Sequence, residues 1–99
     1  MAKRKPIKKM GVKAMEWKQT RIKWFQENAS KDGYYYCHYC GVPMTMEECT
    51  LDHIKNRSSH KRLTHDFNNL VPCCVIDNVL KGSQDYGRFC ERYYPRLVR

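Results

Sequence analysis

The spacing of the cysteines constrains this chain more than any other feature of its sequence. Cys37 and Cys40 are separated by two residues, so one tight turn can present two thiolates to a single metal ion. Cys73 and Cys74 follow about 30 residues later, where structural zinc sites place a second such turn. Asp77 stands where the last cysteine of a second C-x-x-C would fall, and aspartate can bind zinc through oxygen.

Adjacent residues at the start of a helix cannot easily both reach one ion, so either Cys73 or Cys74 is expected to be a small buried apolar residue. The sequence therefore predicts a structural zinc ion held by Cys37, Cys40, Cys74 and Asp77, with Cys73 as the alternative ligand. Cys49 and Cys90 are assigned to the core rather than to the metal.

The size and polarity of the chain indicate one small domain in a reducing compartment. Its 99 residues allow only a modest core, for which a bound metal is a common support. Twelve aromatic residues argue against a wholly disordered chain, although the mean hydropathy is −0.80. The basic N-terminus lacks the apolar stretch of a signal peptide, and no apolar run is long enough to cross a membrane. These features predict a cytoplasmic protein with thiols rather than disulfides.

The positive charge is concentrated at one end. The formal charge is +9, of which residues 1–31 carry +8 through ten Lys or Arg against two Glu. Such an excess predicts a polyanion partner, and nucleic acid is favoured over an anionic membrane. The segment with Lys3, Arg4, Lys5, Lys8 and Lys9 is predicted to be a flexible arm that contacts phosphates, with a solubilising tail as the alternative.

Local patterns predict an α+β fold. A helix is expected over residues 12–29, with Trp17, Trp24 and Phe25 facing the domain. Strands are expected at 34–37, 50–54 and 67–71, a helical turn from Thr45 to Glu48, and a helix over 74–80 that ends at Gly82. Ser83 is expected to cap a last helix whose inward stripe is Tyr86, Phe89, Cys90 and Tyr93.

An Asp-His pair stands at the centre of the remaining pattern. Asp52 and His53 lie between apolar Leu51 and Ile54, and alone they would be read as a polar strand end. Their significance comes from Asn69-Leu70-Val71-Pro72 and Asn78 downstream. The loop histidines His60 and His65 are expected to be solvated, and His38 to be exposed within the Cys37–Cys40 turn.

Together these motifs resemble the HNH endonuclease family, of the small phage or mobile-element type. The resemblance runs from Cys37 to Gly82 and rests on the motifs Cys37-x-x-Cys40, Leu51-Asp52-His53-Ile54, Asn69-Leu70-Val71-Pro72, Cys74-x-x-Asp77-Asn78 and Lys81-Gly82. Family members usually carry cysteine where this chain has Asp77. The implied fold is a ββα-metal unit with a zinc knuckle, preceded by an N-terminal helix and followed by a C-terminal one.

The resemblance implies a role for each matched residue. Asp52 and Asn78 would bind a catalytic Mg²⁺ or Mn²⁺ through oxygen, and His53 would be the general base. Asn69 would hold the loop and orient His53. The chain would then comprise a basic arm and amphipathic helix at 1–31 and a nuclease domain at 32–99.

The expected activity is metal-dependent hydrolysis of DNA phosphodiester bonds, with nicking as the expected outcome of a single active site. DNA contacts are expected from the arm and from Arg57, Lys61, Arg62 and Lys81. The alternative is a non-catalytic zinc-ribbon protein that binds nucleic acid, although such a binder has no reason to carry Asp52, His53 and Asn78 together. A homodimer, or a complex with phage or host proteins, is left open.

Overall fold

The computed structural model describes the backbone of residues 6–98 and the side chains of residues 15–98. Three α-helices are present in this part of the chain: α1 (Pro6–Glu27), α2 (Val75–Lys81) and α3 (Tyr86–Tyr93). The strands form two antiparallel pairs, β1 (Tyr35–Tyr36) with β2 (Pro43–Met44) and β3 (Thr50–His53) with β4 (Leu70–Cys73). The α+β architecture expected from the sequence is confirmed.

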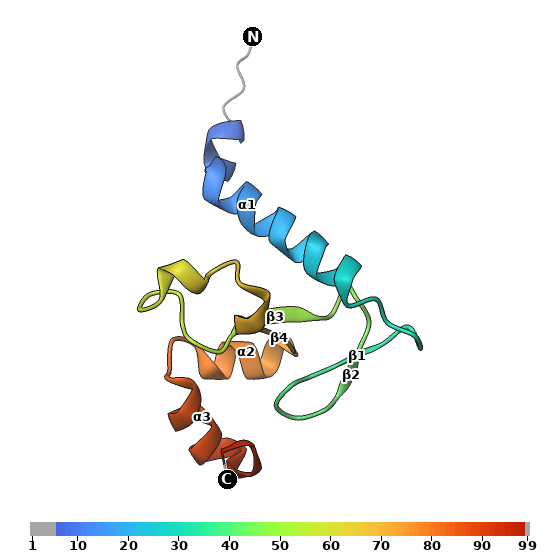
Figure 1. The fold of residues 1–99 in the computed structure, drawn as a ribbon, viewed down its shortest axis with the longest axis vertical. Helices are drawn as coiled ribbons and strands as arrows, with labels where there is room; N and C mark the ends of the chain where they lie inside the picture. Colours follow the sequence, from blue (N-terminus) through green and yellow to red (C-terminus); the bar gives the residue numbers. More distant parts are fainter. Residues whose placement is uncertain (1–5, 99) are drawn as a thin grey trace.

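The β3–β4 sheet lies between α1 on one side and α2 on the other (Figure 1). Its register places Asp52 opposite Val71 and His53 opposite Leu70. Cys74 follows the last residue of β4 and caps α2, because its sulfur accepts a hydrogen bond from the backbone N–H of Asp77. The strand therefore passes directly into the helix, and β3, β4 and α2 form the expected ββα unit.

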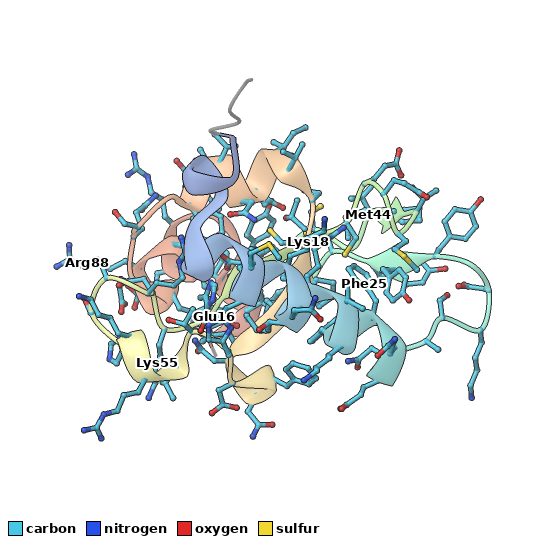
Figure 2. The ribbon with its side chains drawn as sticks, turned by 90° about the horizontal axis from the view of Figure 1, so that it is seen from above. Glu16, Lys18, Phe25, Met44, Lys55 and Arg88 are labelled. Atoms are coloured by element: carbon cyan, nitrogen blue, oxygen red, sulfur yellow. The ribbon has the colours of Figure 1, made fainter. Side chains whose placement is uncertain are left out.

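An aromatic cluster holds α1 against the sheets. Phe25 packs edge-on against both Trp24 and Tyr35, with ring centroids 5.1 and 5.0 Å apart. Phe25 and Met44, both labelled in Figure 2, are buried in the same core. The Arg21 guanidinium also donates a hydrogen bond to the carbonyl oxygen of Cys49 at 2.9 Å, which connects α1 to the start of β3. The predicted inward face of this helix is thus confirmed, as is the burial of Cys49 and Cys90.

Helix α1 begins earlier than predicted. It starts at Pro6, a residue whose fixed φ suits the first turn of a helix, rather than near residue 12. The backbone of Lys8 and Lys9 is therefore helical and not part of a flexible arm, while Lys3, Arg4 and Lys5 lie outside the described residues. In the described part of the chain, no helix has both the length and the apolar character needed to cross a membrane.

The C-terminal half differs from the prediction in three local details. Residues Phe67–Asn69 form a 3-10 turn before β4, because the Asp66 side chain accepts from the N–H of Asn68. Asp85, not Ser83, caps α3 by accepting from the N–H of Arg88. Tyr93 is 39% exposed rather than inward, because the helix ends there and the chain turns.

Candidate active site and metal cluster

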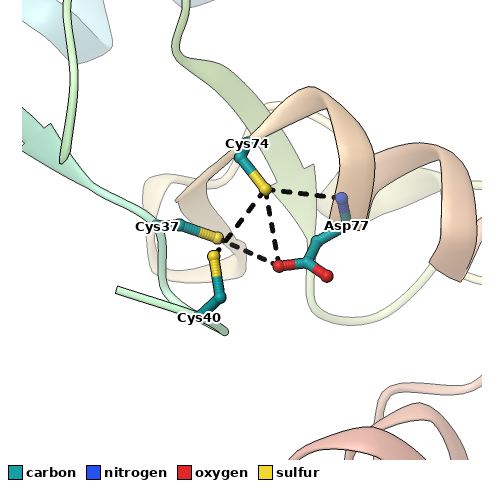
Figure 3. A group of neighbouring side chains, drawn as sticks. All are labelled: Cys37, Cys40, Cys74 and Asp77. Atoms are coloured by element: carbon teal, nitrogen blue, oxygen red, sulfur yellow. Dashed lines mark hydrogen bonds between the residues drawn. The ribbon is translucent and has the colours of Figure 1, made fainter. Parts of the chain in front are cut away.

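Four side chains from two distant segments converge on one point. Cys37 and Cys40 lie in a turn that Gly41 closes with a left-handed φ of 79°, and Gly41 donates its N–H to the Cys37 carbonyl. Cys74 and Asp77 lie at the start of α2. The three sulfurs and one carboxylate oxygen all lie within 4.8 Å of one another (Figure 3). These side chains could therefore hold a metal ion.

The spacing of these atoms suits a tetrahedral ion. The Cys40 and Cys74 sulfurs are 3.9 Å apart, and Asp77 Oδ2 lies 3.5 Å from the Cys37 sulfur and 3.4 Å from that of Cys74. Zinc–sulfur bonds of about 2.3 Å and zinc–oxygen bonds of about 2.0–2.2 Å would separate tetrahedral ligands by about 3.6–3.8 Å. Cys73 is fully buried and donates its thiol to the Cys74 carbonyl, so it lies outside the cluster.

The cluster gathers groups that ionise to negative charge. Its hydrogen-bonding contact with Cys73 lowers the pKa of Cys37 to about 5, whereas burial raises the pKa of Cys74 to about 12. Burial also raises the pKa of Asp77, but hydrogen bonds from Tyr94 and the cysteines outweigh it and bring the pKa below its ordinary value. A cation among them would favour ionisation of all four groups.

A second polar group lies at β3. Asp52 Oδ2 accepts a hydrogen bond from the Tyr39 hydroxyl at 2.5 Å and lies 3.4 Å from the Lys81 ammonium. Lys81 is only 1% exposed, and its ammonium also donates to the backbone carbonyl of His53 at 3.1 Å. This burial contradicts the expectation that Lys81 presents its charge to DNA. Its ammonium instead balances the Asp52 carboxylate.

Asn78 reaches the same region from α2. Its Nδ2 donates to Thr50 Oγ1 at 2.8 Å, and Thr50 in turn donates to the Cys73 carbonyl. Thr50 and Asp52 share one face of β3, because alternate residues of a strand point the same way. Asp52, His53, Asn78 and Lys81 all line one groove of about 960 Å³. The structure thus brings together the three residues that the sequence grouped.

His53 has a defined ring orientation. Its Nε2 lies 2.9 Å from the Thr64 carbonyl oxygen, an acceptor, so this nitrogen carries the ring proton and Nδ1 is the basic one. The Trp17 ring packs against the imidazole with centroids 5.0 Å apart. Burial lowers the pKa of His53 from its ordinary 6.5, which keeps the ring neutral at pH 7. A neutral, oriented imidazole can accept a proton.

Asn69 fastens the loop that follows β3. Its Oδ1 accepts from the N–H of Lys55 at 2.8 Å, and its Nδ2 donates to the carbonyls of Lys55 and Leu63. These bonds close the loop over residues 55–63, which also carries exposed Arg57, Lys61 and Arg62. Arg57 and Lys61 line the groove.

Helix α1 contributes to the groove in a way that the sequence did not indicate. Glu16 and Trp17 line it, and the Arg57 guanidinium lies 5.9 Å from the Trp17 ring centroid. His65 is exposed, as predicted, but its Nδ1 also lies 2.5 Å from Thr20 Oγ1, so this histidine connects its segment to α1. His38 is half-buried with Nε2 2.8 Å from the Tyr86 hydroxyl, not exposed. The helical spacing of Trp17 indicated that it is buried, but no pattern in the sequence predicted its contact with His53.

A comparison with protein-family models matches residues 37–84 to the HNH endonuclease model. Residues 37–84 therefore belong to the HNH endonuclease family. The matched segment contains the metal cluster, both strands of the β3–β4 sheet, the loop and α2, but not α1 or α3. Neither the curated proteins nor the solved structures gave a match. The resemblance to this family is thus confirmed for this segment, and it supports a nuclease-type function in general.

Proposed function

We propose that this HNH protein is a metal-dependent DNA endonuclease that nicks one strand at a time. The observation that carries the proposal is the single groove in which Asp52, His53 and Asn78 meet. Arg57 and Lys61 border the same groove with exposed positive charge, which suits a phosphate backbone. One candidate active site among the described residues favours cleavage of one strand, because a double-strand break would need a second copy or a second visit.

The donor atoms in the groove fit a hard divalent ion. A carboxylate from Asp52 and an amide oxygen from Asn78 are ligands that Mg²⁺ and Mn²⁺ prefer. Because Tyr39 and Lys81 both approach Oδ2 of Asp52, the other carboxylate oxygen is the one we assign to the ion. When bound, such an ion supplies positive charge to the scissile phosphate and to the leaving oxygen.

The protein's own residues perform the remaining steps. Nδ1 of His53 takes a proton from the attacking water, while the Thr64 carbonyl and the Trp17 ring hold the imidazole in place. Arg57, Lys61 and Arg62 hold the DNA backbone. Asn69 keeps their loop closed. We assign a structural zinc ion to Cys37, Cys40, Cys74 and Asp77, because three sulfurs and one oxygen suit zinc better than magnesium.

The test is cleavage of supercoiled plasmid with and without Mg²⁺ or Mn²⁺. Nicked circles should appear first, and only with the divalent ion. His53→Ala should lower the rate by about 10²–10⁴-fold, the usual loss for a general base, while DNA binding is kept. His60→Ala is the matched control, because His60 is an exposed histidine on the loop that follows β3.

Cleavage by His53→Ala at the wild-type rate would refute the assignment of the base. Metal-independent DNA binding without any cleavage would favour the non-catalytic zinc-ribbon alternative. A phage or mobile-element origin stays a prediction.

A further inference from the structure

Tyr94 touches the metal cluster from outside the matched HNH segment. It follows α3, and its hydroxyl donates to Oδ1 of Asp77 at 2.7 Å. The other oxygen, Oδ2, faces the sulfurs of Cys37 and Cys74 at 3.5 and 3.4 Å. The two carboxylate oxygens therefore have separate partners. One points into the cluster, and the other is held by the tyrosine.

We propose that Tyr94 is a positioning residue for Asp77, and that it is what allows a carboxylate to serve as the fourth ligand. This proposal rests on the proposed zinc centre. A thiolate offers one donor atom, whereas a carboxylate can rotate or bind through either oxygen. A hydrogen bond to Oδ1 limits that freedom and leaves Oδ2 as the single ligand atom. Groups that hold a ligand in this way strongly affect metal affinity.

The tyrosine is itself fixed by its surroundings. Its ring packs against Phe89 and Tyr39, with centroids 5.8 and 6.0 Å away. Its backbone N–H donates to the Cys90 carbonyl at 2.7 Å and so ends α3. Tyr39 lies in the turn between Cys37 and Cys40, so the aromatic cluster also contacts the other half of the metal cluster. The hydroxyl is therefore held in place before any ion arrives.

A purely structural role for Tyr94 makes a different prediction from a positioning role. If the hydrogen bond only joins the C-terminal segment to α2, its loss should weaken the protein whatever residue stands at position 77. If Tyr94 acts through the carboxylate, loss of its hydroxyl should weaken Zn²⁺ binding when residue 77 is aspartate. The same loss should leave Zn²⁺ binding unchanged when residue 77 is cysteine. Asp77→Cys provides that background, because it completes the second C-x-x-C.

The experiment uses five full-length proteins: wild type, Tyr94→Phe, Asp77→Cys, the double variant and Tyr93→Phe. Tyr93→Phe is the control, because Tyr93 is an adjacent, exposed tyrosine. Each protein is loaded with Zn²⁺, and its affinity is measured by competition with a colorimetric chelator. Each is also loaded with Co²⁺, whose sulfur-to-metal absorption reports the number of thiolate ligands.

Tyr94→Phe should weaken Zn²⁺ binding by about 10–100-fold, as loss of such a hydrogen bond typically does. Tyr93→Phe should match wild type. The double variant should bind as tightly as Asp77→Cys alone. The Co²⁺ spectra should indicate three thiolates in the proteins that keep Asp77 and four in those that carry Asp77→Cys, whichever residue stands at position 94.

Two results would overturn the proposal while leaving the zinc centre intact. One is a Zn²⁺ affinity of Tyr94→Phe equal to that of wild type. The other is an equal loss of Zn²⁺ affinity on Tyr94→Phe whether residue 77 is aspartate or cysteine. A wild-type protein that retains no Zn²⁺ would instead overturn the zinc centre, and this proposal with it.

Discussion

Replacing Lys81 by methionine should destabilise the protein strongly, and magnesium should reduce that loss. Side chains of Lys81 and Asp52 are only 1% and 7% exposed, with 3.4 Å between the ammonium and the carboxylate. At that distance, with an effective dielectric constant of about 20, their attraction is about 5 kcal/mol. Removing one partner of such a buried pair typically costs about 3–5 kcal/mol, because the other charge stays buried and unbalanced. Methionine keeps the unbranched stem, so little cavity is created.

The unfolding free energy should therefore fall by about 3–5 kcal/mol in buffer without added divalent ions. Magnesium should restore part of the loss, because an ion bound at Asp52 would replace the missing positive charge. Binding to the folded state alone raises its stability as the ion concentration rises above Kd. The stabilisation by Mg²⁺ should thus be larger in the variant than in wild type.

Urea unfolding with and without Mg²⁺ measures both effects. Lys18→Met is the matched control, because Lys18 is exposed on α1 (Figure 2) and its loss removes the same charge. The reasoning is wrong if Lys81→Met is as stable as Lys18→Met without Mg²⁺. An equal response to Mg²⁺ in variant and wild type would refute the assignment of the ion to Asp52.

Three further outcomes are expected. Tyr39→Phe removes the hydroxyl that donates to Asp52, so half-maximal nicking should need about 10–100-fold more Mg²⁺; an unchanged requirement would contradict this. Deleting residues 1–9 removes five basic residues, so DNA binding should weaken at every sequence and show a shallower dependence on salt. An unchanged slope would mean that this segment only aids solubility. Mild EDTA should abolish activity first, with recovery in Mg²⁺, and stronger chelation should then unfold the chain as zinc leaves. If elemental analysis finds no zinc in the purified protein and all six cysteines of the folded protein titrate as free thiols, the structural zinc ion is excluded.

The features that could be predicted from the sequence are those that local spacing determines. The C-x-x-C turn and the cysteine that starts α2 follow from what a metal ion requires of neighbouring residues. The alternation of β3 and the apolar face of α1 follow from the geometry of one strand and one helix. Local spacing favoured Cys74 over Cys73 as the metal ligand, but the choice depended on where β4 ends, which the sequence did not determine.

The features that could not be predicted depend on contacts between distant segments. Lys81 looks like any basic residue near a helix end, and only the packing of α2 on β3 buries its ammonium beside Asp52. Tyr94 reaches Asp77 because α3 ends at Tyr93 and the chain turns there. The contact between Trp17 and His53 produces no periodic pattern in the sequence. Each residue fits the pattern of its own helix or strand whether or not the two are in contact.

The position of Trp17 gives the protein an internal optical probe. The chain has two tryptophans, of which Trp24 is buried in the core and Trp17 lines the groove beside His53. Anything that enters the groove changes the surroundings of one indole and leaves the other unchanged. In a Trp24→Phe protein the remaining emission would come from the groove alone. Occupancy could then be followed by fluorescence on unlabelled protein, independently of cleavage.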